Sequence, residues 1–90
     1  MPSRHTAIQN KLGLHARASA KLVETANHYE SEVILITDKQ QQANAKSIMG
    51  LMLLAAGQGT PIELQAEGED AGAALDAVEQ LINARFGEKE

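Results

Sequence analysis

The stretch Ile62-Glu63-Leu64-Gln65-Ala66-Glu67, with the segment 71–86 (AGAALDAVEQLINARF) that follows it, decides the fold. In the first part apolar and polar residues alternate, which is typical of a strand with one buried face. In the second part apolar residues recur at helical spacing, which predicts an amphipathic helix capped by Asp70. These helix residues are Ala71, Ala74, Leu75, Val78, Leu81, Ile82 and Phe86. A strand and a helix with one apolar side each need a second layer to cover them.

The same patterns can be followed along the rest of the chain. They predict strands over 3–9, 32–37 and, more weakly, 41–45, a helix over 16–28, and a short apolar helix from Ser47 to about Ala56 that stops at Gly57. We therefore predict an α+β fold of order β-α-β-β-α-β-α. Its architecture is an open-faced two-layer sandwich, with a four-stranded antiparallel sheet covered on one face by three helices. Glu63, Gln65 and Glu67 then lie on the face left to solvent.

Composition excludes several classes of protein. With 43% apolar and 22% charged residues, the 90-residue chain is typical of a globular protein, and we expect one domain over 1–90. The absence of Cys excludes disulfides and thiolate metal sites. A net charge of −4 argues against nucleic-acid partners. The apolar stretch 48–56 is too short for membrane insertion, and no signal-peptide pattern opens the chain, so we expect a cytoplasmic protein with a frayed tail at 87–90.

The segment 11–18 (KLGLHARA) places His15 at the N-terminal edge of the first predicted helix. Backbone N–H groups lack partners there and the helix dipole is positive, so an anion is stabilised. A phosphate on a ring nitrogen of His15 could accept hydrogen bonds from the amides of Ala16, Arg17 and Ala18. The Arg17 guanidinium could add charge-assisted bonds, and a neutral imidazole is a nucleophile near pH 7. A histidine that merely caps the helix is the other interpretation, and a lone His-X-Arg does not decide between them.

Ser47 is expected to cap the second helix, which is apolar on nearly all sides. Helical spacing lets Leu51 and Leu54 face the sheet. The side left over is a candidate docking surface made of Ile48, Met49 and Met52. Methionine suits a surface that meets several partners, whereas burying the whole helix is difficult in a two-layer fold.

Metal and cofactor chemistry finds no support in the sequence. His5 and His28 have no companions at metal-ligand spacing, so we expect no metal site. We also expect no cofactor. An RNA-binding or small-ligand α+β domain is disfavoured by the acidity and by the lack of stacking aromatics, since Tyr29 and Phe86 are the only aromatic residues.

Three segments, 10–17 (NKLGLHAR), 44–51 (NAKSIMGL) and 55–60 (AAGQGT), together resemble the HPr family, the histidine phosphocarriers of the bacterial phosphotransferase system. The resemblance runs through almost the whole chain. It implies that enzyme I, which depends on phosphoenolpyruvate, phosphorylates His15, and that Arg17 assists transfer to enzyme IIA-type proteins. In many members the serine that matches Ser47 is phosphorylated by a separate serine kinase, which weakens the carrier role.

One position departs from the family pattern. Most members have Pro where this chain has Ala18, and Pro would pre-set the first helical turn. Ala18 with Ser19, and Met49 with Met52, look more like proteobacterial members, including a nitrogen-related branch that serves regulation rather than sugar transport. The alternative function is a regulatory protein-binding module that uses the 47–52 surface without onward phosphate transfer. The presence of both His15 and Arg17 favours the phosphocarrier function over this alternative.

Overall fold

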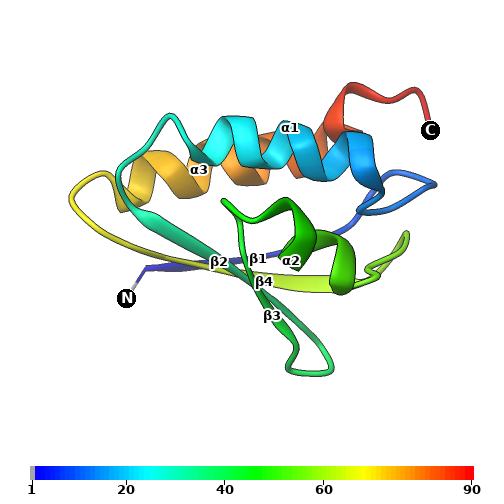
Figure 1. Cartoon of the computed structure of the whole chain (residues 1–90), viewed down its shortest axis with the longest axis horizontal. Helices are drawn as coiled ribbons and strands as arrows, with labels where there is room; N and C mark the ends of the chain where they lie inside the picture. The colour runs from blue at the N-terminus through cyan, green and yellow to red at the C-terminus, as the bar shows by residue number, and fades with distance from the viewer. Residues whose placement is uncertain (1) are drawn as a thin grey trace.

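The computed structural model describes residues 2–90, and its elements follow the predicted order (Figure 1). The strands are β1 (Ser3–Ala7), β2 (Glu32–Thr37), β3 (Gln42–Asn44) and β4 (Pro61–Glu67). The helices are α1 (Ala16–Ala26), α2 (Ile48–Leu53) and α3 (Ala71–Asn83), and a 3-10 turn, η1 (Arg85–Gly87), follows the last helix.

The four strands form one antiparallel sheet in the order β1-β4-β2-β3. Strand β4 lies between β1 and β2, and its Leu64 stands opposite Arg4 on one side and Leu35 on the other. The predicted alternation along β4 is confirmed. Its buried residues are Ile62, Leu64 and Ala66, while Glu63 and Gln65 are half-buried and Glu67 is exposed.

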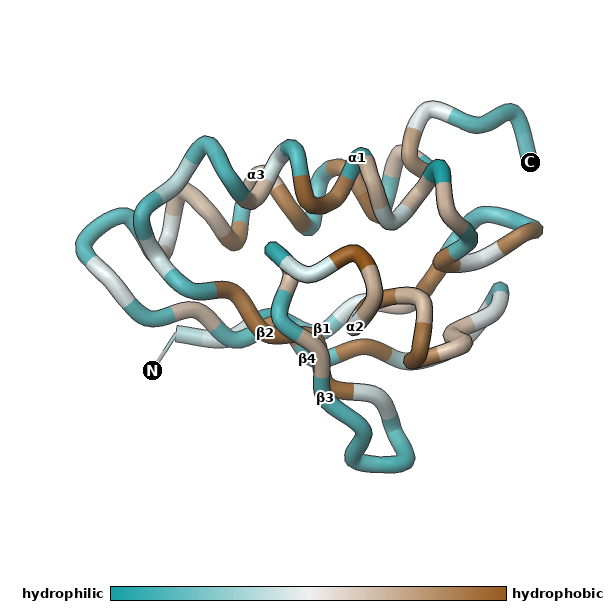
Figure 2. Tube along the Cα trace, in the orientation of Figure 1, coloured by the Kyte–Doolittle hydropathy of each residue, from teal (hydrophilic) through white to brown (hydrophobic). Residues whose placement is uncertain are grey.

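The three helices cover one face of this sheet, which confirms the predicted open-faced sandwich (Figure 1). Helices α1 and α3 run side by side, α3 packs on β1, β4 and β2, and α2 packs on β3 and α1. Figure 2 shows that the hydrophobic stretches of α1 and α3 turn toward the sheet. The core between the layers is aliphatic except for Phe86, which is fully buried.

Helix α2 ends at Leu53, earlier than the predicted Ala56, and Gly57 is not its stop. Ala55 instead takes the left-handed conformation, with φ 51°, and its amide donates to the carbonyl of Met52 at 3.1 Å. After this early end the chain turns inward and Ala56 is buried. The carbonyl of Ala56 accepts a hydrogen bond from the amide of Leu14 at 3.0 Å.

Asp70 occupies the N-cap position of α3, but its side chain makes no cap hydrogen bond, so the predicted cap is wrong. The carboxylate accepts from the amides of Glu30 and Ser31 and from the Ser31 hydroxyl. The Ser31 hydroxyl bond leads the interactions that hold the pKa of Asp70 below its usual range. Because the loop before β2 offers donors without strand partners, the carboxylate joins that loop to α3.

Candidate functional site

The loop between β1 and α1 is fixed to the loop between α2 and β4. The amide of Ile8 donates to the carbonyl of Thr60 at 3.0 Å, and the Leu14 amide donates to Ala56, as described above. Gly13 lies at the closest approach, with φ 68°, and a Cβ there would meet the Cα of Gly57 at 2.8 Å. This position therefore requires glycine. These contacts between two loops far apart in sequence fix the position of His15 just before α1.

His15 occupies the N-cap position of α1, as the sequence predicted. Its backbone is extended, its carbonyl accepts from the Ser19 amide at 2.9 Å, and its side chain makes no cap hydrogen bond. The next three amides, of Ala16, Arg17 and Ala18, precede the first amide that can find an acceptor within the helix. The structure thus brings together a histidine ring that is 30% exposed and the positive end of a helix.

A depression on the surface joins His15 to the C-terminal tail. It is lined by Lys11, Leu12, His15, Ala16, Arg17, Glu88, Lys89 and Glu90. Arg17 is exposed here, and within residues 2–90 it takes part in no ion pair. Its guanidinium is therefore available for an anion held near His15. Ala16 is exposed beside it, whereas the Ala18 side chain is buried in the core.

Sequence reasoning missed Glu88, which lies in the tail that was predicted to fray. Glu88 Oε2 lies 2.5 Å from His15 Nε2, and Asn10 Nδ2 donates to Glu88 Oε1 at 3.0 Å. Asn10 is fully buried and also donates to the carbonyl of Gly13 at 2.9 Å. Burial raises the pKa of Glu88, but the hydrogen bonds from Asn10 and His15 outweigh it, and that pKa lies below its ordinary value.

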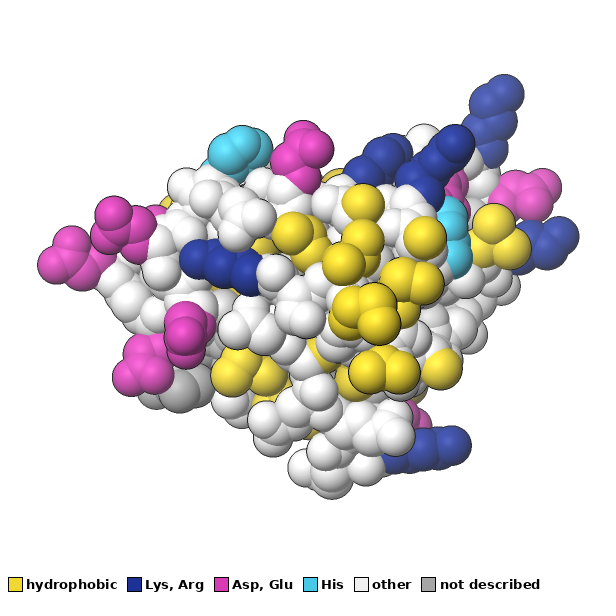
Figure 3. Space-filling view, viewed as in Figure 1, with side chains coloured by type: hydrophobic (Ala, Val, Ile, Leu, Met, Phe, Trp, Pro, Cys, Tyr) yellow, Lys and Arg dark blue, Asp and Glu magenta, His cyan; other side chains and the backbone are white. Residues whose placement is uncertain are grey.

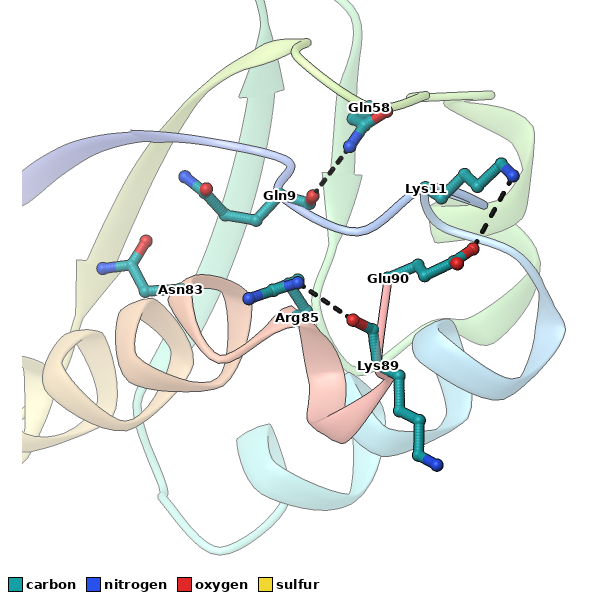
Figure 4. A pocket seen from close by; sticks show the side chains of 7 residues that line it. All are labelled: Gln9, Lys11, Gln58, Asn83, Arg85, Lys89 and Glu90. Carbon is teal, nitrogen blue, oxygen red and sulfur yellow. Dashed lines mark hydrogen bonds and ion pairs between the residues drawn. The ribbon is translucent and has the colours of Figure 1, made fainter.

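The tail is held because η1 reverses the chain and anchors it. Arg85, Phe86 and Gly87 all have positive φ, and the Phe86 ring is buried in the core. Lys21 Nζ donates to the carbonyl of Phe86 at 2.7 Å, and the Lys11 amide donates to the carbonyl of Glu90 at 2.8 Å. Figure 4 shows the tail from the side of a neighbouring pocket, with the Lys11–Glu90 and Arg85–Lys89 contacts drawn. The apolar Phe86 was the one sequence signal for this packing.

Ser47 caps α2 as predicted. Its Oγ accepts from the amide of Gly50 at 3.1 Å, and the residue is exposed. The neighbouring Lys46 is held by a bond from its Nζ to the carbonyl of Tyr29 at 2.8 Å. Ser47 is therefore a structural cap whose hydroxyl remains at the surface.

The predicted division of α2 into two sides is found in the structure. Leu51 and Leu54 are buried, whereas Ile48, Met49 and Met52 are 40%, 67% and 43% exposed. Two further large apolar side chains that the sequence did not single out, Leu53 and Leu12, are 77% and 68% exposed. Figure 3 shows hydrophobic side chains gathered over α2, below the basic side chains near the start of α1. Leu12 also lines the depression over His15, so an apolar surface borders the site.

Among the described residues, no group of three or more His, Asp or Glu could hold a metal ion. No helix in residues 2–90 has the length and apolarity needed to cross a membrane. His5 and His28 are exposed and lie outside the depression over His15.

Comparison with known proteins places this geometry in a family. Residues 2–84 match the family described as "PTS HPr component phosphorylation site". The chain is 54% identical to phosphocarrier protein HPr of Neisseria meningitidis serogroup A over 83 residues, which is 92% of each chain. It is 51% identical to HPr of Cupriavidus necator over 90 residues, all of both chains, and 44% identical to phosphocarrier protein NPr of Shewanella violacea over 85 residues, 94% of this chain and 92% of that one. The solved structure of HPr-C-His from Thermoanaerobacter tengcongensis has a TM-score of 0.93 and 42% identity, with both chains fully covered. The chain therefore belongs to the HPr family.

Proposed function

We propose that this protein is a phosphoryl carrier of the phosphotransferase system that takes phosphate from enzyme I on His15 and passes it to IIA-type proteins. Membership of the HPr family, with HPr and NPr phosphocarriers as relatives, supports the carrier role. The assignment of the site rests on where the structure places His15 and Arg17. His15 stands at the N-cap of α1 with a side chain that does not cap the helix, and Arg17, which makes no ion pair in the described part of the chain, lines the same depression.

Each part of the site has a role in this proposal. His15 supplies the nucleophilic ring nitrogen. The amides of Ala16, Arg17 and Ala18 bind the phosphoryl oxygens, where the helix dipole favours negative charge. The Arg17 guanidinium adds a charge-assisted contact and assists onward transfer. No cofactor is required, since the partner proteins deliver and remove the phosphoryl group.

Partner proteins dock on the apolar surface beside this site. The surface comprises the predicted Ile48, Met49 and Met52, extended by Leu12 and Leu53. Leu12 lines the depression over His15, so a partner that covers Leu12 can also reach the ring. Flexible methionine side chains let the same surface fit both the donor and the acceptor.

Ser47 is proposed as a regulatory phosphorylation site for a serine kinase. Its hydroxyl is exposed and lies one residue before the docking surface begins. A phosphate there would add up to about two negative charges beside Ile48 and Met49. Partners that present acidic groups to this surface would then bind more weakly.

The cellular setting also belongs to the proposal. We place the protein in the cytoplasm as a single HPr-like domain over 1–90, without membrane insertion and without a nucleic-acid partner, in keeping with its net charge of −4. Its relatives include both an HPr and an NPr phosphocarrier. A regulatory module without onward transfer is not favoured, since a pure binding surface has no use for the His15 and Arg17 pair.

Incubation with enzyme I and labelled phosphoenolpyruvate, followed by mapping of acid-labile phosphate, tests this function. We expect one labelled residue, His15, and no label in His15→Ala. The exposed His28 provides a matched control, because His28→Ala should be labelled like the wild type. Undiminished labelling of a folded His15→Ala protein would overturn the site assignment.

A further inference from the structure

The Glu88 carboxylate contacts the ring that is proposed to carry phosphate. One oxygen lies 2.5 Å from His15 Nε2, and the other accepts from Asn10 Nδ2 at 3.0 Å. The ring and the loop that leads to it are thus joined through one carboxylate. The Glu88 side chain is only 14% exposed, so few water molecules compete for these contacts.

We propose that Glu88 is a positioning residue for phosphoryl acceptance: it accepts a hydrogen bond from Nε2 of His15 and so holds the ring in one tautomer and one orientation. The proposal rests on the proposed function of His15. The family match ends at residue 84, so Glu88 lies beyond the segment that the family description covers.

The identity of the donor follows from the chemistry of the contact. An ionised carboxylate can only accept hydrogen bonds, so Nε2 must donate. The lowered pKa of Glu88 keeps it ionised near neutral pH. In a neutral ring with its proton on Nε2, Nδ1 holds the lone pair. The side chain of His15 makes no cap hydrogen bond to α1, so the helix amides do not engage that lone pair.

The transfer step is balanced without loss of a proton from His15. The Nδ1 lone pair forms the new N–P bond, the bond between phosphorus and the donor atom of enzyme I breaks, and its electron pair stays with the donor. The ring keeps its Nε2 proton and acquires positive charge. The Glu88 carboxylate faces that charge and stabilises it, as the carboxylate of a catalytic triad stabilises an imidazolium.

The contacts of the neighbouring tail residues support a positioning role for Glu88. Phe86 is buried two residues before Glu88, and the carbonyl of Glu90 is held by the Lys11 amide two residues after it. Glu88 is therefore fixed on both sides. Its second oxygen is bound by the buried Asn10, which leaves the first oxygen directed at the ring.

Two variants of Glu88 separate the hydrogen bond from the rest of the tail. Glu88→Ala removes the acceptor, whereas Glu88→Gln keeps an oxygen that can accept from Nε2. Glu67→Ala is the matched control, because Glu67 is exposed at the end of β4 and does not line the depression over His15. The readouts are the tautomer of His15 from nitrogen-15 NMR of the ring, and the rate of phosphoryl acceptance from enzyme I.

We expect the wild type and Glu67→Ala to show the Nε2–H tautomer and the same rate. Glu88→Ala should show a mixture of tautomers and accept phosphate about tenfold more slowly, the lower end of what loss of an orienting partner costs. Glu88→Gln should lie closer to the wild type in both readouts.

The proposal is overturned if Glu88→Ala keeps the Nε2–H tautomer, or if it accepts phosphate as fast as the wild type or faster. The last result would mean that the tail only shields His15. Failure of the underlying function would look different, because His15→Ala would then still be labelled.

Discussion

The N-terminus of α1 and the N-terminus of α2 are built in opposite ways. At α2, Ser47 turns its hydroxyl back onto its own helix and accepts from the Gly50 amide at 3.1 Å. At α1, His15 makes no such bond, and its ring is held by Glu88 from the tail. The Ser47 side chain therefore bonds to its own helix, whereas the His15 side chain contacts a residue outside α1.

This difference shows why a helix N-terminus alone does not make a phosphate site. Both ends have amides without helical partners and a positive dipole. Only the end at α1 combines them with the ring of His15, the Glu88 carboxylate against that ring, and Arg17, which makes no ion pair within residues 2–90. The end at α2 has its cap in place and begins a helix with exposed apolar side chains, which fits the regulatory role proposed for Ser47.

The largest effect on phosphoryl acceptance is expected when the N-terminus of α1 receives the same kind of cap as the N-terminus of α2. In His15→Ser, a capping residue replaces the nucleophile, so phosphoryl acceptance from enzyme I should fall below detection while the protein stays folded. The double variant His15→Ser, Ser47→His should also remain unlabelled, since a histidine at α2 would lack Glu88 and Arg17. Labelling by enzyme I and thermal melting measure both properties. A labelled double variant would show that any helix N-terminus is sufficient.

The next effect concerns Arg17. Arg17→Lys keeps the charge but loses the planar guanidinium, so transfer should slow about tenfold, less than the ~100-fold that loss of a whole charge-stabilising donor costs. The melting temperature should not change, because Arg17 is exposed. Single-turnover transfer rates measure this, with Arg4→Lys as the control, since Arg4 on β1 pairs with Asp76 on α3 and does not line the depression over His15. Wild-type transfer by Arg17→Lys would reduce Arg17 to a surface charge.

A smaller effect on phosphoryl acceptance is expected at Ser47, the N-cap of α2. Aspartate is itself a good N-cap, so Ser47→Asp should fold normally. Its charge beside the docking surface should raise the KM of enzyme I for this protein about tenfold, equal to ~1.4 kcal/mol of binding free energy. The exposed Ser3 on β1 offers a control in Ser3→Asp. An equal KM for both variants would leave Ser47 as a helix cap only.

The smallest effect is on stability in acid. The pKa of Glu88 lies below its ordinary value of 4.5, so its stabilising contacts contribute fully above that pH and are lost as the pH falls through the folded-state pKa. The free energy of unfolding of the wild type should therefore exceed that of Glu88→Gln at pH 7, and the gap should narrow below about pH 4.5. Urea unfolding across this range checks it. A gap that widens in acid would contradict the assigned charge state of Glu88.

The sequence was sufficient for features that repeat along one element. Alternation in β4 and the β-branched run in β2 predicted both strands, and helical spacing predicted the buried side of α3. The position of His15 at the start of α1 followed from the turn before it. Regular elements are predictable because each residue repeats the same local signal.

The parts that escaped prediction depend on contacts between distant residues or on backbone that carries no local signal. Glu88 meets His15 across 73 positions, and nothing near Glu88 in sequence announces the pairing. Positive φ at Ala55, Arg85 and Phe86 ends α2 early and reverses the tail, yet these residue types rarely adopt that conformation. Asp70 has the sequence of a cap, but the donors of the neighbouring loop take its carboxylate.

The most direct test is to load nitrogen-15-labelled protein with phosphate from enzyme I and compare its amide spectrum before and after. We expect a phosphohistidine at residue 15 and the largest amide shifts at Ala16, Arg17 and Ala18, with Gly50 at the start of α2 unchanged. Phosphate at another residue, or a loaded protein in which those three amides keep their original positions, would contradict it.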